Sequence, residues 1–138
     1  MYFRKEYEFL SNMYCHPISV HFKSGDIIRF KCVESAFQAM KCTTLTDIME
    51  FTMLNGFEAR RQGRRVHLRA NWEKIKIPIM KKLLLIKFSE PRLRNQLLAI
   101  SEPIIEDNTW GDTFWGKCNG VGKNMLGQLL MEVREELK

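Results

Sequence analysis

Apolar residues recur at two different periods along this chain, and the first period indicates β-structure near the start. Apolar and polar residues alternate over Ile18–Phe22, and a second short run rich in apolar residues, Ile27–Phe30, follows the turn Lys23–Asp26. Alternation around a short turn that contains glycine is typical of a β-hairpin. Apolar faces in Tyr2–Phe9 predict one further strand, and Pro103–Glu106 predicts another.

From Val33 onward the apolar residues are spaced as in helices. The predicted helices cover 33–41, a segment from Thr44 or Thr46 towards Leu54, 57–62, 72–88, 91–99, and a segment from Lys123 or Asn124 to Leu137. Pro78 lies within the longest pattern, so we expect either a kink there or a helix that begins near it. Many helices and few strands predict an α+β fold, a predominantly helical single domain over residues 1–138 with a small N-terminal β-hairpin.

The predicted helix at Val33–Lys41 carries the most informative polar residues. At about 100° per residue, Glu34, Gln38 and Lys41 fall within roughly 60° of one another. The apolar residues of the segment form an adjoining stripe that anchors the helix. A carboxylate, an amide and an amine along one anchored edge can converge on a small polar ligand. The alternative is an exposed amphipathic helix, and this segment alone favours that alternative.

Composition and charge narrow the class of protein. The chain has 138 residues, 45% hydrophobic and 28% charged, which is ordinary for a soluble globule with one core. The formal net charge of +6 suits phosphorylated ligands or nucleic acid, and it equally suits mere solubility. Basic residues concentrate between Arg60 and Arg69 and are scattered elsewhere, so no continuous nucleic-acid-binding stripe is predicted.

Cysteine and histidine spacing predicts neither a metal site nor a redox motif. These residues are Cys15, Cys32, Cys42, Cys118, His16, His21 and His67. No pair has the spacing of a zinc knuckle. We expect no metal and no cofactor, and reduced thiols. No apolar signal region or membrane-spanning run is evident, so we expect a cytoplasmic protein.

Six blocks, spread over nearly the whole chain, combine charged, aromatic and glycine residues. They are Phe9–Tyr14, Val33–Lys41, Glu58–Arg64, Leu68–Trp72, Asp112–Gly116 and Gly122–Arg134. In this order and at about this spacing they resemble the NADAR family. The resemblance implies hydrolysis of an N-glycosidic bond between a ribose phosphate, or ADP-ribose, and a nitrogenous base. The chain departs from the family at Ser35, where a histidine is frequent, and at Asn71, where an acidic residue is usual.

Cleavage of such a bond develops positive charge on the anomeric carbon of the sugar. Glu34 and Asp112 are the best carboxylates for this charge, although acidic residues such as Asp112 often only form turns. The resemblance implies a Schiff-base role for Lys41, whose neutral amine would attack the ring-opened sugar. The predicted catalytic residues are therefore Glu34, Lys41 and Asp112. We expect the polar edge at Glu34 and the turn at Asp112 to face the same cavity.

The expected substrate-binding residues are polar, basic, aromatic or glycine. They are Ser11, Asn12, Gln38, Arg60, Arg64, Trp72, Trp115, Gly122 and Asn124. Trp72 and Trp115 are candidates for stacking on a flat base; a core position is the alternative. Trp110 is expected in the core.

A phosphate is expected near the start of the last helix, because free amides at a helix N-terminus favour anions. Gly122 and Asn124 lie there. Arg60 and Arg64, one helical turn apart, are further candidates for a phosphate contact, and solvent exposure is equally compatible with their positions.

Two substrates fit the resemblance: a ribosylated aminopyrimidine phosphate of the riboflavin pathway, and ADP-ribose attached to guanine in nucleic acid. The expected partner is thus a phosphorylated ribosyl small molecule or an ADP-ribosylated nucleic acid. A non-catalytic module that binds ADP-ribose or a nucleotide is one alternative. A small basic nucleic-acid-binding domain is another.

Overall fold

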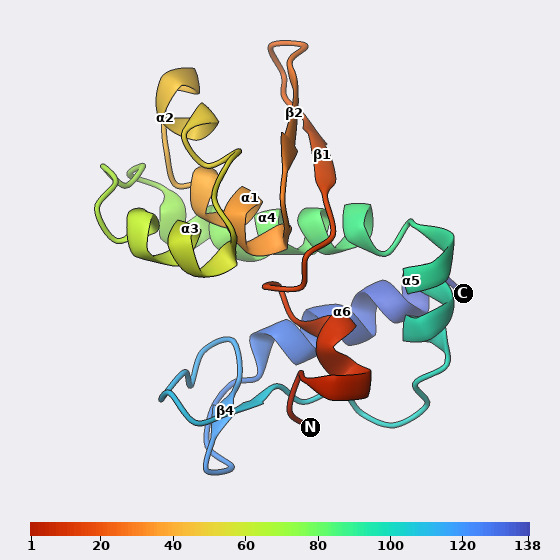
Figure 1. Ribbon diagram of the computed structural model, residues 1–138. Coiled ribbons are helices and arrows are strands. Elements are labelled where there is room, and N and C mark those ends of the chain that lie inside the picture. The colour runs from red at the N-terminus through yellow and green to blue at the C-terminus, as the bar shows by residue number, and fades with distance from the viewer. The chain divides into compact units, whose positions relative to one another are not determined.

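The computed structural model describes residues 1–138. It contains helices and two small sheets (Figure 1). The chain divides into two compact units. Unit 1 comprises Met1–Ser11 and Phe88–Lys138, and unit 2 comprises Asn12–Lys87. The predicted α+β class is confirmed.

Unit 2 opens with the predicted hairpin. Strands β1 (Ile18–His21) and β2 (Ile27–Phe30) pair antiparallel, with Ile18 opposite Phe30. Ile18, Ile28 and Phe30 are buried, as expected for a sheet with one covered face.

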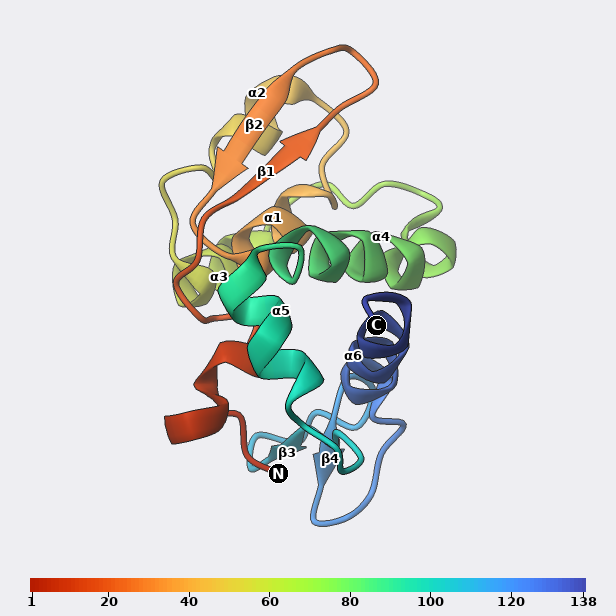
Figure 2. The same ribbon diagram turned by 90° about the vertical axis from the view of Figure 1, so that its right-hand side faces the viewer.

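Four helices complete unit 2. They are α1 (Val33–Ala39), α2 (Leu45–Met49), α3 (Gly56–Gly63) and α4 (Trp72–Lys87). Helix α1 contacts the other three helices and both strands, and Figure 2 shows the hairpin on one side of α1 with α3 on the other. All seven residues of α1 are buried. The alternative of an exposed amphipathic helix is therefore wrong.

The helix ends of unit 2 follow local capping chemistry. The Thr44 hydroxyl accepts a hydrogen bond from the Asp47 amide, which confirms one of the two predicted caps, although α2 ends at Met49, before Leu54. Asn55 and Glu58 form a capping box at the start of α3.

One helix prediction in unit 2 is wrong, and one of the two alternatives given for Pro78 is excluded. Helix α1 ends at Ala39, so Lys41 lies in the turn that follows, where its amide donates to the Gln38 carbonyl. Helix α4 runs without interruption from Trp72 with Pro78 inside it, so the helix does not begin at that proline.

Unit 1 contains the 3₁₀ helix η1 (Lys5–Leu10), α5 (Pro91–Leu98), α6 (Met125–Glu136) and a short parallel pair, β3 (Asp107–Asn108) with β4 (Lys117–Cys118). The strand predicted at Tyr2–Phe9 is wrong. Phe9 and its neighbour Leu10 are both buried, which a strand with alternating faces does not allow.

The strand predicted at Pro103–Glu106 is also wrong. The Glu106 amide donates to the side chain of Asn124 instead of to a neighbouring strand, and pairing begins only at Asp107. The core of unit 1 includes Phe9 and Phe88, whose rings meet edge to face. No helix of the protein is both long enough and apolar enough to span a membrane.

Candidate active site

Three segments of unit 2 hold Glu34 in place. Its backbone amide donates to the Asn12 carbonyl (3.0 Å). Its Oε1 accepts a hydrogen bond from Gln38 Nε2 (2.8 Å) and lies 3.6 Å from Arg60 Nε. The residue is only 6% exposed. A buried carboxylate requires partners of this kind, and they fix its orientation.

Small residues of α3 allow this helix to approach Glu34 and Gln38 closely. Gly56, Ala59 and Gly63 are all buried. A Cβ added at Gly63 would overlap Gln38 Oε1, and one added at Gly56 would overlap the Met13 sulfur and lie 3.3 Å from Glu34 Cβ. The two glycines are thus required by close packing against α1.

Two buried acceptors of unit 2 have no hydrogen-bond donor. They are Gln38 Oε1 and Asn12 Oδ1. The other end of each amide is engaged: Gln38 Nε2 donates to Glu34, and Asn12 Nδ2 lies 3.5 Å from the Met80 sulfur. Both oxygens are covered by protein, and Gln38 Oε1 faces Gly63 of α3, so neither is an open acceptor in this structure.

Lys41 follows directly after this cluster. Burial lowers the pKa of its ammonium group, and the charges of Arg64 and Lys76 lower it further, whereas Glu34 and Cys42 act in the opposite sense. The amine lies 6.0 Å from the centre of the Trp72 ring. A lysine with a lowered pKa has a larger neutral, nucleophilic fraction near neutral pH.

Arg69 holds the backbone next to Lys41, a contact that the sequence did not predict. Its amide donates to the Lys41 carbonyl (3.1 Å) and its guanidinium to the Cys42 carbonyl (3.0 Å). Arg69 belongs to the block Leu68–Trp72 that carried the family resemblance. Its position in that block was the one feature of the sequence that pointed to Arg69.

Trp72 is mostly covered. It is 5% exposed, and its ring contacts Phe37 at a centroid distance of 5.1 Å. Little ring surface is left for stacking on a base. Its evident contribution is the aromatic surface close to Lys41.

In unit 1, Asp112 organises a turn. Its Oδ1 accepts hydrogen bonds from the amides of Phe114 (3.0 Å) and Trp115 (2.9 Å). The side chain of Asn108 holds the Asp112 backbone on both its amide and its carbonyl. The structural role considered for Asp112, turn formation, is therefore present in the structure.

This turn packs on the start of α6. Each of the four amides of residues 123–126 donates to a carbonyl of this turn. The pairs are Lys123 with Thr113, Asn124 with Gly116, Met125 with Phe114 and Leu126 with Trp115. These amides are already engaged, so the anion site expected from free amides at this helix start is wrong.

Gly122 and Asn124 have evident structural functions in unit 1. Gly122 has φ +148°, and a side chain there would overlap the Gly116 carbonyl. The Asn124 side chain accepts from the Glu106 amide and donates to the Ile104 carbonyl, both at 2.9 Å. Asn124 therefore fixes the segment that leads into β3.

The structure brings most of the predicted site residues together within unit 2. Six of them connect through the contacts and charges described above: Asn12, Glu34, Gln38, Lys41, Arg60 and Arg64. Trp72 adjoins Lys41. The other five predicted site residues belong to unit 1: Ser11, Asp112, Trp115, Gly122 and Asn124. The expectation that Glu34 and Asp112 face one cavity stays a prediction.

Trp110 was expected in the core, and this is wrong: its side chain is 59% exposed. It follows Thr109 in a loop with a glycine at φ +83° after it, which turns the chain at the surface. No three His, Cys, Asp or Glu side chains gather as a metal-binding group.

Comparison with known proteins decides the family. The model of the NADAR domain matches residues 1–138. This chain belongs to the NADAR family. Among its NADAR relatives is N-glycosidase YbiA of Shigella boydii serotype 4, which is 37% identical over 137 residues, covering 96% of this chain and 82% of YbiA.

Other relatives extend this NADAR assignment. The riboflavin biosynthesis protein PYRR of Zea mays, a chloroplastic protein, is 33% identical over 92% of this chain, which spans 23% of that protein. The NMR structure of YbiA from E. coli has a TM-score of 0.82 at 34% identity and covers 99% of this chain and 83% of YbiA. The fold predicted from the NADAR resemblance is confirmed, and the names of the relatives confirm the enzyme class, a glycosidase.

Proposed function

We propose that this NADAR protein hydrolyses an N-glycosidic bond between a phosphorylated ribosyl group and a nitrogenous base, with Lys41 as nucleophile and Glu34 as the carboxylate beside the developing positive charge. One observation carries the proposal. A half-buried lysine with a lowered pKa follows a buried carboxylate on the same short helix and turn. The relatives named N-glycosidase support the reaction class.

The reaction starts on a sugar whose anomeric carbon bears an exocyclic amine of the base. The bond between C1 and the ring oxygen breaks, its electron pair and a proton go to that oxygen, and the nitrogen lone pair forms a protonated imine to C1. Glu34, held by Gln38 and Arg60, stabilises this positive charge.

Neutral Lys41 then attacks C1, and the imine electron pair returns to the nitrogen of the base. A proton moves from the lysine nitrogen to the nitrogen of the base, the bond from C1 to the base breaks, and the base leaves as a free amine. Lys41 is left as an imine on C1. Water adds to C1, the bond to Lys41 breaks, and the sugar is released as an aldehyde that closes to its ring.

We assign Gln38 and Asn12 to the binding of the sugar, supported by their direct hydrogen bonds with Glu34. Arg64, exposed at the end of α3, supplies positive charge for a phosphate. We assign Asp112 to the same reaction as a second carboxylate, supported by its position in a family block. All four cysteines are free thiols, which suits the reducing cytoplasm where we place the reaction.

We propose two substrate classes for this site: a ribosylated aminopyrimidine phosphate and ADP-ribosylated guanine. Both present an amino-bearing base. The name of the maize relative connects it with riboflavin biosynthesis and supports the first class.

The proposal is tested by incubating the protein with each substrate and measuring free base together with aldehydic sugar. Lys41→Met should abolish turnover. Glu34→Gln should reduce it about 10²- to 10⁴-fold, the usual size of one catalytic acid or base. Lys82→Met, an exposed lysine on α4, is the matched control and should retain full activity. Saturable binding without product would show a non-catalytic binding module and overturn the proposal.

A further inference from the structure

Lys76 of α4 is a mostly covered cation to which the reaction steps above give no role. Its side chain is only 17% exposed, and its Nζ is paired with Glu73 Oε2 at 2.6 Å. This contact shows that the side chain points back towards the start of α4, as long side chains on helices do. Lys76 also lies one helical turn after Trp72, so these two side chains share a face of α4.

Trp72 connects this face of α4 with the proposed site. The Trp72 ring centre lies 6.0 Å from Lys41 Nζ. Burial is the main cause of the lowered pKa of Lys41, and the charges of Arg64 and Lys76 lower it further, so both cations act electrostatically on Lys41. Two cations beside the nucleophile of a reaction on a phosphorylated sugar are suited to bind the phosphate group.

The carboxylate of Glu73 shows where an anion is accepted on Lys76. The Glu73 side chain is 77% exposed, and an exposed ion pair of this kind contributes little to stability, so a stronger anion can replace it. A phosphate group carries more negative charge than a carboxylate and has three acceptor oxygens. Because α4 begins at Trp72, the first turn of the helix also favours negative charge at this place.

We propose that Lys76 binds the phosphate group of the substrate, and that this phosphate displaces the Glu73 carboxylate from the Lys76 ammonium group. The inference rests on the proposed function, which supplies the phosphorylated ribosyl ligand. Glu73 therefore pairs with the cation in the free protein and releases it when the sugar phosphate enters. Arg64, already assigned to a phosphate, would contact the same group from α3.

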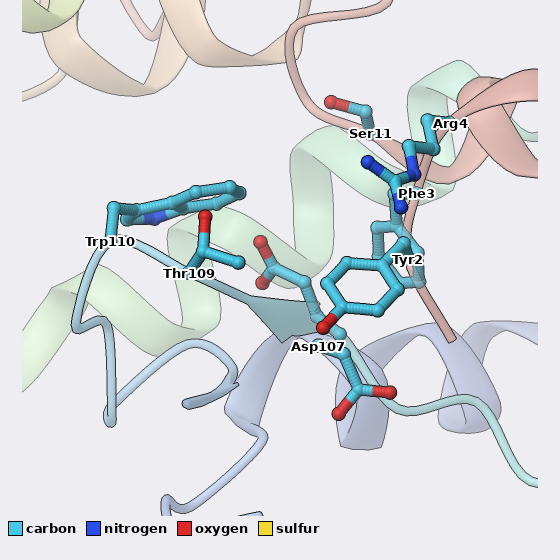
Figure 3. Close-up of a pocket in the computed structure, with 8 residues that line it drawn as sticks. Tyr2, Phe3, Arg4, Ser11, Asp107, Thr109 and Trp110 are labelled. Atoms are coloured by element: carbon cyan, nitrogen blue, oxygen red, sulfur yellow. The ribbon is translucent and has the colours of Figure 1, made fainter. Parts of the chain in front are cut away.

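A pocket of about 280 Å³ in unit 1 is an alternative place for a phosphate, because Arg4 lines it. Figure 3 shows Arg4, Tyr2 and Asp107 among the side chains of this pocket. The Arg4 guanidinium already lies over the Tyr2 ring, at 4.7 Å from its centre, and Glu106 and Asp107 both line the pocket. Adjacent carboxylates repel a phosphate group, so this pocket is less suited to the sugar phosphate than Lys76.

Calorimetric titration of the full chain with ribitol 5-phosphate tests the proposal. This probe has no aldehyde, so it cannot form an imine with Lys41, and its binding reports on non-covalent contacts alone. Lys76→Met should weaken its binding about 10- to 100-fold, as expected for the loss of a hydrogen bond between charged groups, and Lys76→Arg should retain most of the affinity. Unchanged binding in Lys76→Met, or no binding to the unmodified protein, would overturn the proposal.

Glu73→Gln tests the exchange of anions. Removal of the competing carboxylate should strengthen binding of ribitol 5-phosphate about two- to fivefold, the size expected for one exposed ion pair, and unchanged or weaker binding would overturn the exchange. Lys74→Met removes an exposed lysine of the same helix and is the matched control, which should bind normally. Arg4→Gln should also bind normally. Loss of binding in Arg4→Gln but not in Lys76→Met would place the phosphate in unit 1 and overturn the proposal.

The binding test is separate from the test of the proposed reaction, because ribitol 5-phosphate is not turned over. Lys41→Met should lose turnover and still bind the probe. In turnover assays at a pH where the rate has levelled off, Lys76→Met should raise KM for a phosphorylated substrate more than it lowers kcat. Binding of the probe that depends on Lys76, together with no release of base from any substrate, would overturn the proposed reaction and not the phosphate site.

Discussion

Lys41 sets the pH dependence of the proposed reaction, because only its neutral amine attacks C1. Burial is the main cause of its lowered pKa. Turnover should therefore rise with pH and level off below the ordinary lysine value of 10.5. Initial rates at saturating substrate from about pH 6 to about pH 10 check this. Rates that fall as the pH rises through this range would contradict it.

The charge of Arg64 provides a more specific version of this prediction. Arg64 lowers the pKa of Lys41. In Arg64→Gln the pKa of Lys41 should rise. At saturating substrate, where loss of the proposed phosphate contact does not limit the rate, turnover at neutral pH should fall by up to about fivefold and recover at higher pH, as expected for one exposed charge. The control is Arg61→Gln, at an exposed arginine of α3. It should leave the dependence of turnover on pH unchanged.

Lys87, at the end of α4, predicts how stability depends on pH. It is 1% exposed and lies 5.5 Å from the Tyr14 ring centre, and burial lowers the pKa of its ammonium group to about 7. Between that value and 10.5 the unfolded chain binds more protons at this residue. The free energy of unfolding should therefore increase with pH across this window, by up to about 1.4 kcal/mol per pH unit from Lys87. Below about pH 7 Lys87 should make no contribution to the pH dependence.

Denaturant unfolding at several pH values checks this. Lys87→Met should reduce the slope of unfolding free energy against pH between about pH 7 and about pH 10. Lys82→Met, exposed on the same helix, should retain the slope. Identical slopes for the two variants would contradict the role assigned to Lys87.

At the scale of elements, the contact between α1 and α3 determines how Gln38 is oriented. In Gly63→Ala the new methyl group would displace the end of the Gln38 side chain, which is flexible but buried. We expect a modest loss of stability, about 1–3 kcal/mol, and a larger loss of turnover because the hydrogen bond from Gln38 to Glu34 breaks.

The double variant Gly63→Ala with Gln38→Ala separates these effects. Removal of the displaced side chain should restore most of the stability, whereas turnover should stay low. Thermal unfolding and initial rates measure the two quantities. Full turnover in Gly63→Ala would show that the orientation of Gln38 is unimportant for the reaction.

The turn at Asp112 allows its structural role to be distinguished from its proposed charge role. Asp112→Asn keeps an oxygen for the amides of Phe114 and Trp115, so stability should change little, whereas turnover should fall about 10²-fold if the charge acts in the reaction. Asp112→Ala should additionally lose about 1 kcal/mol of stability, as at a helix cap. Normal turnover in Asp112→Asn would show that Asp112 has only the structural role of forming the turn.

Sequence periodicity predicted the elements that have enough residues to show a period. The hairpin and the helices α4, α5 and α6 are of this kind. Strands β3 and β4 have two residues each, too few for alternation to be visible. Their place depends on hydrogen bonds from Asn124, which is distant in sequence.

For the whole molecule, the family resemblance identified residues that composition and periodicity do not. Within unit 2 it correctly brought Glu34, Gln38 and Arg60 together. It did not distinguish residues that hold backbone, such as Asn124, from residues that contact ligand, because both recur in the family blocks. The exposure of Trp110 depends on tertiary packing and was therefore not predicted.

Trapping of the covalent intermediate tests the central claim most directly. Borohydride added during turnover would reduce the imine between Lys41 and C1 to a stable secondary amine, and peptide mass spectrometry would locate the adduct. The account predicts a sugar phosphate on the peptide that contains Lys41, and none in Lys41→Met. Product formation with no adduct, or with an adduct on another lysine, would contradict the account.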